Sequence, residues 1–176
     1  MGKEDLINLT KQWTGLRKEK FEQIYGSYFD PVRSYLYYRC GDTELATDIA
    51  QEVFLLVWEK KHKIGQKKLK GLLFKMAGDM FANKHKKAKV ETGYLESIRF
   101  SQACQPPDGQ LEYGELKANY EKALAALPEK QRVVFLMSRM ENLKYQEIAG
   151  RLQVSVKTVE KRMSNALLYL KTVLKQ

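Results

Sequence analysis

Residues 127 to 174 read LPEKQRVVFLMSRMENLKYQEIAGRLQVSVKTVEKRMSNALLYLKTVL. The apolar residues recur at the three- and four-residue spacing of helices that bury one face. The pattern predicts a short helix over residues 145–151, a turn at Gln153 and Val154, and a longer final helix capped by Ser155. This order is typical of a helix-turn-helix, whose second helix enters the major groove of DNA.

The final helix has one apolar and one polar face. The residues expected to face inward are Val159, Met163, Ala166, Leu167, Leu170 and Leu174. On the polar face, basic and hydroxyl side chains suit phosphates, while glutamate, lysine and asparagine can read base edges. The predicted DNA-contacting residues are Lys157, Thr158, Glu160, Lys161, Arg162, Ser164 and Asn165. An ordinary three-helix bundle with a solvated face is the alternative.

The rest of the chain also has helical periodicity, and it lacks the alternation of β-strands. One apolar stripe covers residues 21–36, with Pro31 marking a kink or a new start. A second helix begins near Glu44 behind the capping residues Asp42 and Thr43. A third follows Gly65 and is expected to bury Leu69, Leu72, Leu73, Met76, Ala77 and Met80. The sequence therefore predicts an all-α chain with two small helical domains.

Composition suggests where these domains end. Residues 90–115 lose periodicity and contain Gly93, Pro106 and Pro107, so they predict a linker. The expected domains are thus residues 1–89 and 116–176. The net charge of +10 is unevenly distributed, since residues 59–89 carry +9, residues 90–116 carry −4 and residues 131–176 carry +6. Two basic blocks around an acidic linker suggest two separate contacts with a polyanion, or two solvated lysine-rich helices.

Several functional classes find no support in the sequence. No apolar run reaches 18 residues, and the N-terminus lacks a secretory pattern, so a cytoplasmic protein without membrane insertion is expected. Cys40 and Cys104 have no metal-ligand spacing and suit a reducing compartment. His62 and His85 have no evident partner for catalysis, and no glycine-rich phosphate loop is present. We expect no metal, no cofactor and no enzymatic activity.

The second helix has an unusual outward face. Asp48, Glu52, Leu55 and Glu59 lie at i, i+4, i+7 and i+11, on one line along the helix. A leucine among acids indicates a site for a protein partner, because interfaces place apolar residues inside a polar rim. The alternative is a solvated helix with one stray leucine.

The third helix is rich in lysine, and Phe74 lies off its apolar stripe. An exposed aromatic side chain among lysines suits stacking on an unpaired base. Phe74 as an ordinary core residue is the alternative. Asp79 would repel phosphate, so it is expected to accept a hydrogen bond from a base or to pair with a lysine. Asn83, one turn later, is the better candidate for a base contact.

Taken together, these segments resemble the extracytoplasmic-function branch of the sigma-70 family of bacterial RNA polymerase initiation factors, over roughly residues 18–174. DIAQEVFLLVWEK (residues 48–60) resembles the helix that binds the polymerase clamp. LKGLLFKMAGDMFANKHKKAK (residues 69–89) resembles the helix for the promoter −10 element, although Gly78-Asp79 stands where the family often has Arg-Asn. LPEKQRVVFLM and YQEIAGRLQVSVKTVEKRMSNAL resemble the domain for the −35 element.

The resemblance implies functional roles for the exposed residues. The polymerase-binding set is Asp48, Gln51, Glu52, Leu55 and Glu59. The −10 set is Lys67, Lys68, Lys70, Phe74, Lys75, Asp79, Asn83, Lys86 and Lys87. The −35 set is the polar face of the final helix. The implied partners are core RNA polymerase, promoter DNA and an anti-sigma factor.

One alternative function is a helix-turn-helix transcriptional regulator whose N-terminal domain senses a ligand or dimerises. The segment SVKTVE (residues 155–160) also resembles the helix-turn-helix of response regulators. Against this alternative, no strand that could carry a phosphoacceptor aspartate is evident. The +9 block at residues 59–89 also fits DNA better than a small ligand.

Overall fold

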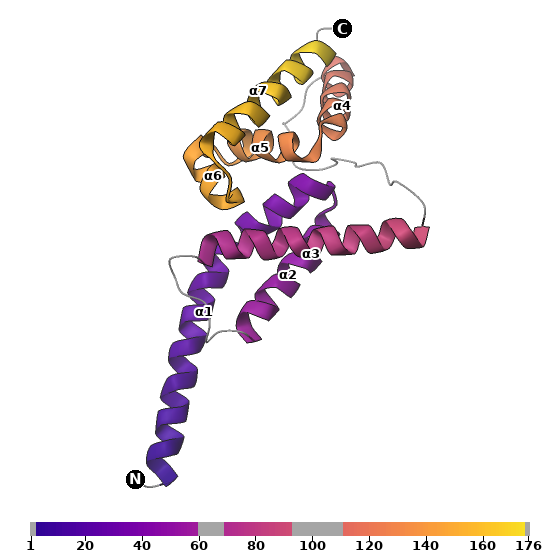
Figure 1. Cartoon of the computed structure of the whole chain (residues 1–176). Helices are drawn as coiled ribbons and strands as arrows, with labels where there is room; N and C mark the ends of the chain where they lie inside the picture. Colours follow the sequence, from indigo (N-terminus) through magenta and orange to yellow (C-terminus); the bar gives the residue numbers. More distant parts are fainter. Residues whose placement is uncertain (1–2, 60–68, 93–110, 175–176) are drawn as a thin grey trace.

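The computed structural model describes residues 3–59, 69–92 and 111–174, and the side chains of residues 18–59, 69–85 and 118–174. Within these residues the chain is all-α, as predicted (Figure 1). The elements are α1 (Lys3–Cys40), α2 (Thr43–Glu59), α3 (Leu69–Thr92), α4 (Leu111–Ala126), α5 (Glu129–Met140), α6 (Tyr145–Leu152) and α7 (Val156–Val173). None of these helices is long and apolar enough to span a membrane.

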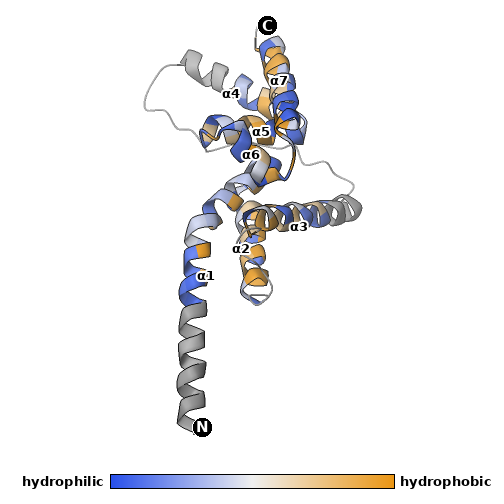
Figure 2. Cartoon of the chain, turned by 60° about the vertical axis from the view of Figure 1, so that its left-hand side comes forward, coloured by the Kyte–Doolittle hydropathy of each residue, from blue (hydrophilic) through white to orange (hydrophobic). Residues whose placement is uncertain are grey.

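The first three helices form one packed unit, in which α1 contacts α2 and α3, and α2 contacts α3. Asp42 caps α2 as predicted, since its Oδ1 accepts a hydrogen bond from the Leu45 N–H at 3.0 Å. The helix α1 runs through Pro31 without a new start. Figure 1 and Figure 2 show α1 bending along its course, which is the usual effect of a proline inside a helix.

The last four helices form a second unit, in which α7 packs against α4, α5 and α6. In Figure 2, α7 carries hydrophobic and hydrophilic residues along its whole length. Its buried residues are Val159, Met163, Ala166 and Leu170. The prediction was wrong for Leu167 and Leu174, which are 41% and 38% exposed. Leu167 flanks the buried stripe beside Ala166, and Leu174 follows the last residue of α7.

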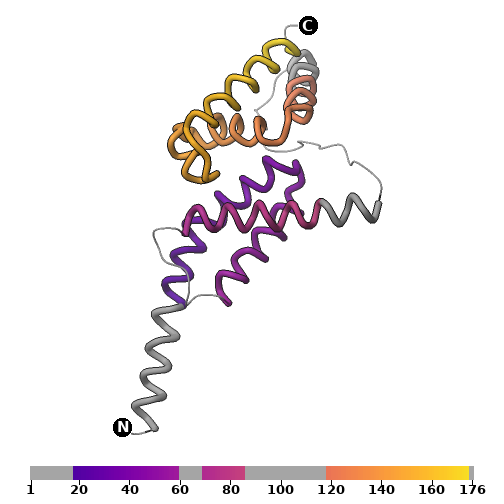
Figure 3. The backbone as a smooth tube through the Cα atoms, viewed as in Figure 1, coloured from indigo at the N-terminus to yellow at the C-terminus, as the bar shows by residue number. Residues whose placement is uncertain are grey.

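The predicted linker, residues 90–115, lies largely outside the described residues. Within them, α3 extends to Thr92 and α4 begins at Leu111, so helical structure enters both ends of that segment. Figure 3 shows the two units lying directly against each other. The contacts between them join α1 to α5 and α3 to α6.

The cap of α7 gives a prediction for stability. The Ser155 Oγ accepts a hydrogen bond from the Thr158 N–H at 3.1 Å, so Ser155→Ala is expected to lower the free energy of unfolding by about 1 kcal/mol. Urea unfolding followed by circular dichroism measures this loss. Ser164→Ala is the matched control, because Ser164 is exposed in the middle of the same helix and alanine favours helix there. Equal stability of the two variants would contradict the assigned cap.

Candidate nucleic-acid interface

The helix-turn-helix forms as the sequence predicts, with Ile148 and Ala149 of α6 and Val159 of α7 buried between the helices. The turn residue Gln153 has a left-handed backbone, with φ of 53°, a conformation that costs a non-glycine residue roughly 1 kcal/mol. The Val154 N–H donates to the Ala149 carbonyl at 3.1 Å, which closes the end of α6. The Arg151 guanidinium also pairs with Glu141, which fixes α6 to the segment that follows α5.

The polar face of α7 is open to solvent. The exposed members of the −35 set are Lys157, Glu160, Lys161, Ser164 and Asn165. Thr158 and Arg162 are partly buried, and the Thr158 hydroxyl shares a hydrogen bond of 2.8 Å with Ser155. This contact makes Thr158 part of the helix cap.

Phe74 is not the exposed aromatic residue that the sequence suggested. Its side chain is 2% exposed and belongs to the core. The Tyr35 ring meets it edge to face, with centroids 5.3 Å apart, and the Arg151 guanidinium lies 5.6 Å from its centroid. The expectation of exposure failed because α3 is covered on two sides, by α1 and by α6. The buried stripe of α3 is accordingly Leu69, Leu73, Phe74, Ala77 and Phe81, whereas Leu72, Met76 and Met80 are only partly buried.

The other residues of the −10 set divide into three groups. Lys75, Asp79 and Asn83 are exposed, and Lys70 is partly buried. Lys67 and Lys68 lie outside the described residues. Lys86 and Lys87 belong to α3, but their side chains are also outside the described part of the chain. The face of α3 that remains open is therefore marked by Lys75, Asp79 and Asn83.

The acidic face of α2 is largely as predicted. Asp48, Gln51 and Glu59 are exposed, and Leu55 is 58% exposed. Glu52 differs because its carboxylate pairs with Lys84 of α3. This ion pair was not anticipated from the sequence, since nothing in the spacing of two residues on different helices indicates it. It leaves Asp48 and Glu59 as the acids that flank Leu55.

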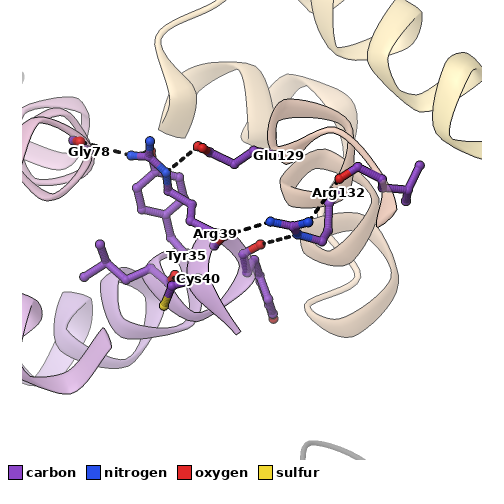
Figure 4. Close-up of polar contacts among 9 residues, drawn as sticks. Tyr35, Arg39, Cys40, Gly78, Glu129 and Arg132 are labelled. Atoms are coloured by element: carbon purple, nitrogen blue, oxygen red, sulfur yellow. Dashed lines mark hydrogen bonds and ion pairs between the residues drawn. The ribbon is translucent and has the colours of Figure 1, made fainter. Parts of the chain in front are cut away.

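Arg132 is the structurally important residue that sequence reasoning missed most clearly. It is 1% exposed, and it donates hydrogen bonds to four backbone carbonyls. Figure 4 shows its guanidinium directed at the end of α1. Two of these carbonyls, on Tyr38 and Arg39, end α1, at 3.0 and 2.8 Å. The other two, on Ala125 and Leu127, end α4, at 2.9 and 3.0 Å. One cation therefore caps two helix C-termini, where carbonyls lack partners and the dipole is negative.

A second arginine extends this junction to α3. The Arg39 Nε donates to the Glu129 carboxylate at 2.6 Å, and its Nη1 donates to the Gly78 carbonyl at 3.1 Å (Figure 4). Its guanidinium also lies 4.5 Å from the centroid of the Phe81 ring. Arg39 thus joins α1, α3 and the first turn of α5. The sequence signals were weak, since only an arginine beside the apolar run VVFLM hinted at Arg132.

Burial changes the titration of the groups around this junction. Desolvation lowers the pKa of Arg132 but leaves it a cation, because guanidinium is not deprotonated in proteins. Burial raises the pKa of Tyr38, and the neighbouring Glu141 carboxylate raises it further. Burial also raises the pKa of Cys40, so its thiol stays protonated at neutral pH and is a poor nucleophile. Among the described residues no cluster of His, Cys, Asp or Glu could hold a metal ion.

Comparison with known proteins shows which proteins this chain is similar to. The family model for sigma-70 region 4 matches residues 117–170, which include the helix-turn-helix. The chain is 28% identical to the ECF RNA polymerase sigma factor SigM of Bacillus subtilis (strain 168), over 76% of this chain and 82% of that protein. It is 27% identical to the ferric citrate uptake sigma factor FecI of Escherichia coli (strain K12), over 84% and 86%. Over most of its length the chain is therefore similar to two bacterial sigma factors, and its last third matches sigma-70 region 4.

A solved structure supports the fold of this chain. The chain superposes with a TM-score of 0.67 on the sigma factor RpoE from Bartonella quintana, at 20% identity, over 89% of this chain and 98% of that one. That structure is a complex with the anti-sigma factor NepR. The sigma-factor relatives favour the initiation-factor interpretation over the alternative of a ligand-sensing regulator.

Proposed function

We propose that this sigma factor binds core RNA polymerase through α2 and two promoter elements through α3 and α7. The observation that carries the proposal is one chain with three separate open faces. These are the acid-flanked Leu55 of α2, the polar stripe of α3 and the polar face of α7. Each face has the chemistry its partner requires, since phosphates select cations and protein interfaces select an apolar residue inside a polar rim.

The proposed division of labour follows the domains expected from the sequence. Residues 1–89 would contact the polymerase and the −10 element, and residues 116–176 would contact the −35 element. Residues 90–115 would link these two domains. At −10 we propose Lys70, Lys75, Asp79 and Asn83 as DNA contacts, together with Lys67, Lys68, Lys86 and Lys87. Phe74 is left out, because its buried ring is not available to a base while α6 covers it.

At −35 we propose that α7 enters the major groove. Lys157, Lys161 and Arg162 would contact phosphates, while Glu160, Ser164 and Asn165 would face base edges. The chemistry of RNA synthesis would belong to the polymerase and not to this chain. Because bacterial polymerase and chromosome are cytoplasmic, the proposal places the chain in the cytoplasm. An anti-sigma factor is proposed as a further partner, since the matched RpoE structure is such a complex.

Transcription in vitro tests this proposal. Core polymerase alone and core polymerase with the chain would be given a library of promoter fragments, and the transcripts sequenced. We expect the chain to direct specific start sites that share an upstream and a downstream element. Transcripts with no specific start site would refute the proposal. Specific starts that share only one element would refute the two-element version.

Lys161 gives a more local prediction. Lys161→Ala is expected to weaken promoter binding by the holoenzyme and to reduce the slope of log K against log salt concentration by roughly 0.9, the value for one lost phosphate contact. Fluorescence anisotropy with a labelled promoter fragment at several salt concentrations measures both. The control is Lys171→Ala, because Lys171 is an exposed lysine outside the proposed reading face. Identical slopes for the two variants would remove Lys161 from the interface.

A further inference from the structure

The last helix carries an acidic side chain that the fold does not use. Residues 129–174, all of which the structure describes, contain four acidic side chains. Three of these bind another part of the fold, as Glu129 with Arg39, Glu141 with Arg151, and Glu147 with the Lys144 N–H. The fourth, Glu160, is exposed, and it forms no ion pair or hydrogen bond with any described residue. Its carboxylate is therefore available to a partner.

The neighbouring cations on α7 do not hold this carboxylate. Lys161 and Arg162 follow it by one and two residues, and side chains at those spacings do not face each other on a helix. Lys157 lies three residues earlier on the same side, but the described contacts include no ion pair between the two. Glu160 also lies in the second turn of α7, which begins at Val156, beyond the first turn where an acid stabilises the helix dipole. The carboxylate thus contributes little to the fold.

Glu160 lies in the part of α7 that the proposed function places in the major groove. Residues near the N-terminus of a recognition helix contact the base edges, and α7 begins directly after the Ser155 cap. Lys157 and Ser164 border Glu160 at i−3 and i+4, and both are exposed. A carboxylate with these neighbours can approach a base edge while Lys157 contacts a phosphate.

The donors and acceptors of the major groove decide which base a carboxylate can read. An ionised carboxylate is only an acceptor, so the guanine O6 and N7 atoms and the thymine O4 atom repel it. The amino groups of cytosine and adenine are the available donors. The adenine N6 lies between two acceptors, its own N7 and the thymine O4, whereas the cytosine N4 has an acceptor on one side and a C–H group on the other. Cytosine is therefore the base at which a carboxylate meets the least repulsion.

We propose that Glu160 selects a cytosine in the upstream promoter element, with its carboxylate accepting a hydrogen bond from the N4 amino group. The inference rests on the proposed function and names the base that one residue reads. A carboxylate also weakens binding to every sequence, by about threefold for one phosphate about 6 Å away in water. Glu160 thus lowers the general affinity for DNA and raises the discrimination between base pairs.

Selection from a promoter library tests this assignment. The starting duplex is a promoter from the transcription screen described above, with its upstream element randomised. Core polymerase with the full chain selects duplexes from this library, and the bound DNA is sequenced. We expect one position at which the wild type prefers cytosine. Glu160→Gln removes the charge at nearly constant size, and it is expected to reduce that preference by about tenfold, within the range for one good base contact. It should also bind duplexes without this cytosine about threefold more tightly, as measured by fluorescence anisotropy.

Charge reversal gives a second outcome that a structural role would not produce. Lysine donates to the guanine O6 and N7 atoms, so Glu160→Lys is expected to exchange cytosine for guanine at the same position. Glu19→Gln and Glu19→Lys make the same changes at an exposed position of α1 and should leave every base preference as in the wild type. A side chain that only supports the helix would alter stability or affinity and leave the selected bases unchanged.

The outcomes separate this inference from the proposed function. A wild-type chain that selects no upstream element would overturn the proposed role of α7, and the assignment of Glu160 with it. If the wild type selects an element and both Glu160 variants select the same bases at every position, only the assignment of Glu160 is overturned. A preference lost in Glu160→Gln that is for a base other than cytosine would also contradict it.

Discussion

Replacing Arg132 with leucine is expected to lower the free energy of unfolding by about 3–5 kcal/mol, because several buried carbonyls lose their hydrogen-bond donor at once. Leucine fills part of the space but donates no hydrogen bond, so the carbonyls that end α1 and α4 lose this donor. Each carbonyl left unsatisfied in a buried position costs roughly 1–3 kcal/mol. Water that enters the junction will recover part of this cost.

Denaturant unfolding of the full chain measures the effect, with Lys130→Leu as the matched control. Lys130 precedes Arg132 on α5 by two residues and is exposed, so its substitution should change stability by about 0.5 kcal/mol or less. The loss of stability in Arg132→Lys should lie between those of Arg132→Leu and Lys130→Leu. Lysine keeps the charge but lacks the planar guanidinium that reaches two helix ends. An Arg132→Leu chain within 1 kcal/mol of the control, a margin close to the scatter of surface variants, would show that the double cap contributes little.

Arg132 also shows what periodicity cannot predict. The apolar run beside it correctly indicates a buried helix, and an arginine there is a conflict that only a tertiary partner resolves. Those partners are backbone carbonyls of α1, more than 90 residues earlier in the chain. Backbone carbonyls occur at every position, so no residue type marks them in the sequence. For the same reason the contacts between the two helical units could not be predicted from the sequence.

The prediction that Phe74 is exposed was wrong for a related reason. Its position on α3 is off the apolar stripe predicted from the sequence, so a single-domain argument leaves it exposed, whereas in the structure the ring also meets Tyr35 of α1. The second unit adds another face to bury, and Phe74 lies on it beneath Arg151. By contrast, the cap at Asp42, the turn at Gln153 and the cap at Ser155 depend on residues within a few positions of each other. Local chemistry was sufficient to predict those features.

The open face of α2 is different, because both its position and its exposure followed from the sequence alone. Leu55 is 58% exposed on a helix that buries Val53, Phe54 and Val57. The core of the N-terminal unit is thus complete without it. An apolar side chain that its own fold does not use is available for a partner, and central apolar residues often contribute most to an interface.

Leu55→Arg is therefore expected to leave the fold intact and to weaken binding to core polymerase by about 30-fold or more, which corresponds to the roughly 2 kcal/mol of an interface hot spot. The guanidinium remains solvated in the free chain and can pair with Glu59, four residues later on the helix. In the complex with polymerase the guanidinium would lose its hydration, and the neighbouring carboxylates, held by the interface, could not pair with it. Titration of labelled core polymerase measures the affinity, and the unfolding midpoint confirms the fold. The control, Gln23→Arg, adds the same charge to an exposed position of α1. If both variants bind equally well, α2 does not contact the polymerase through Leu55, and its acidic face serves another partner.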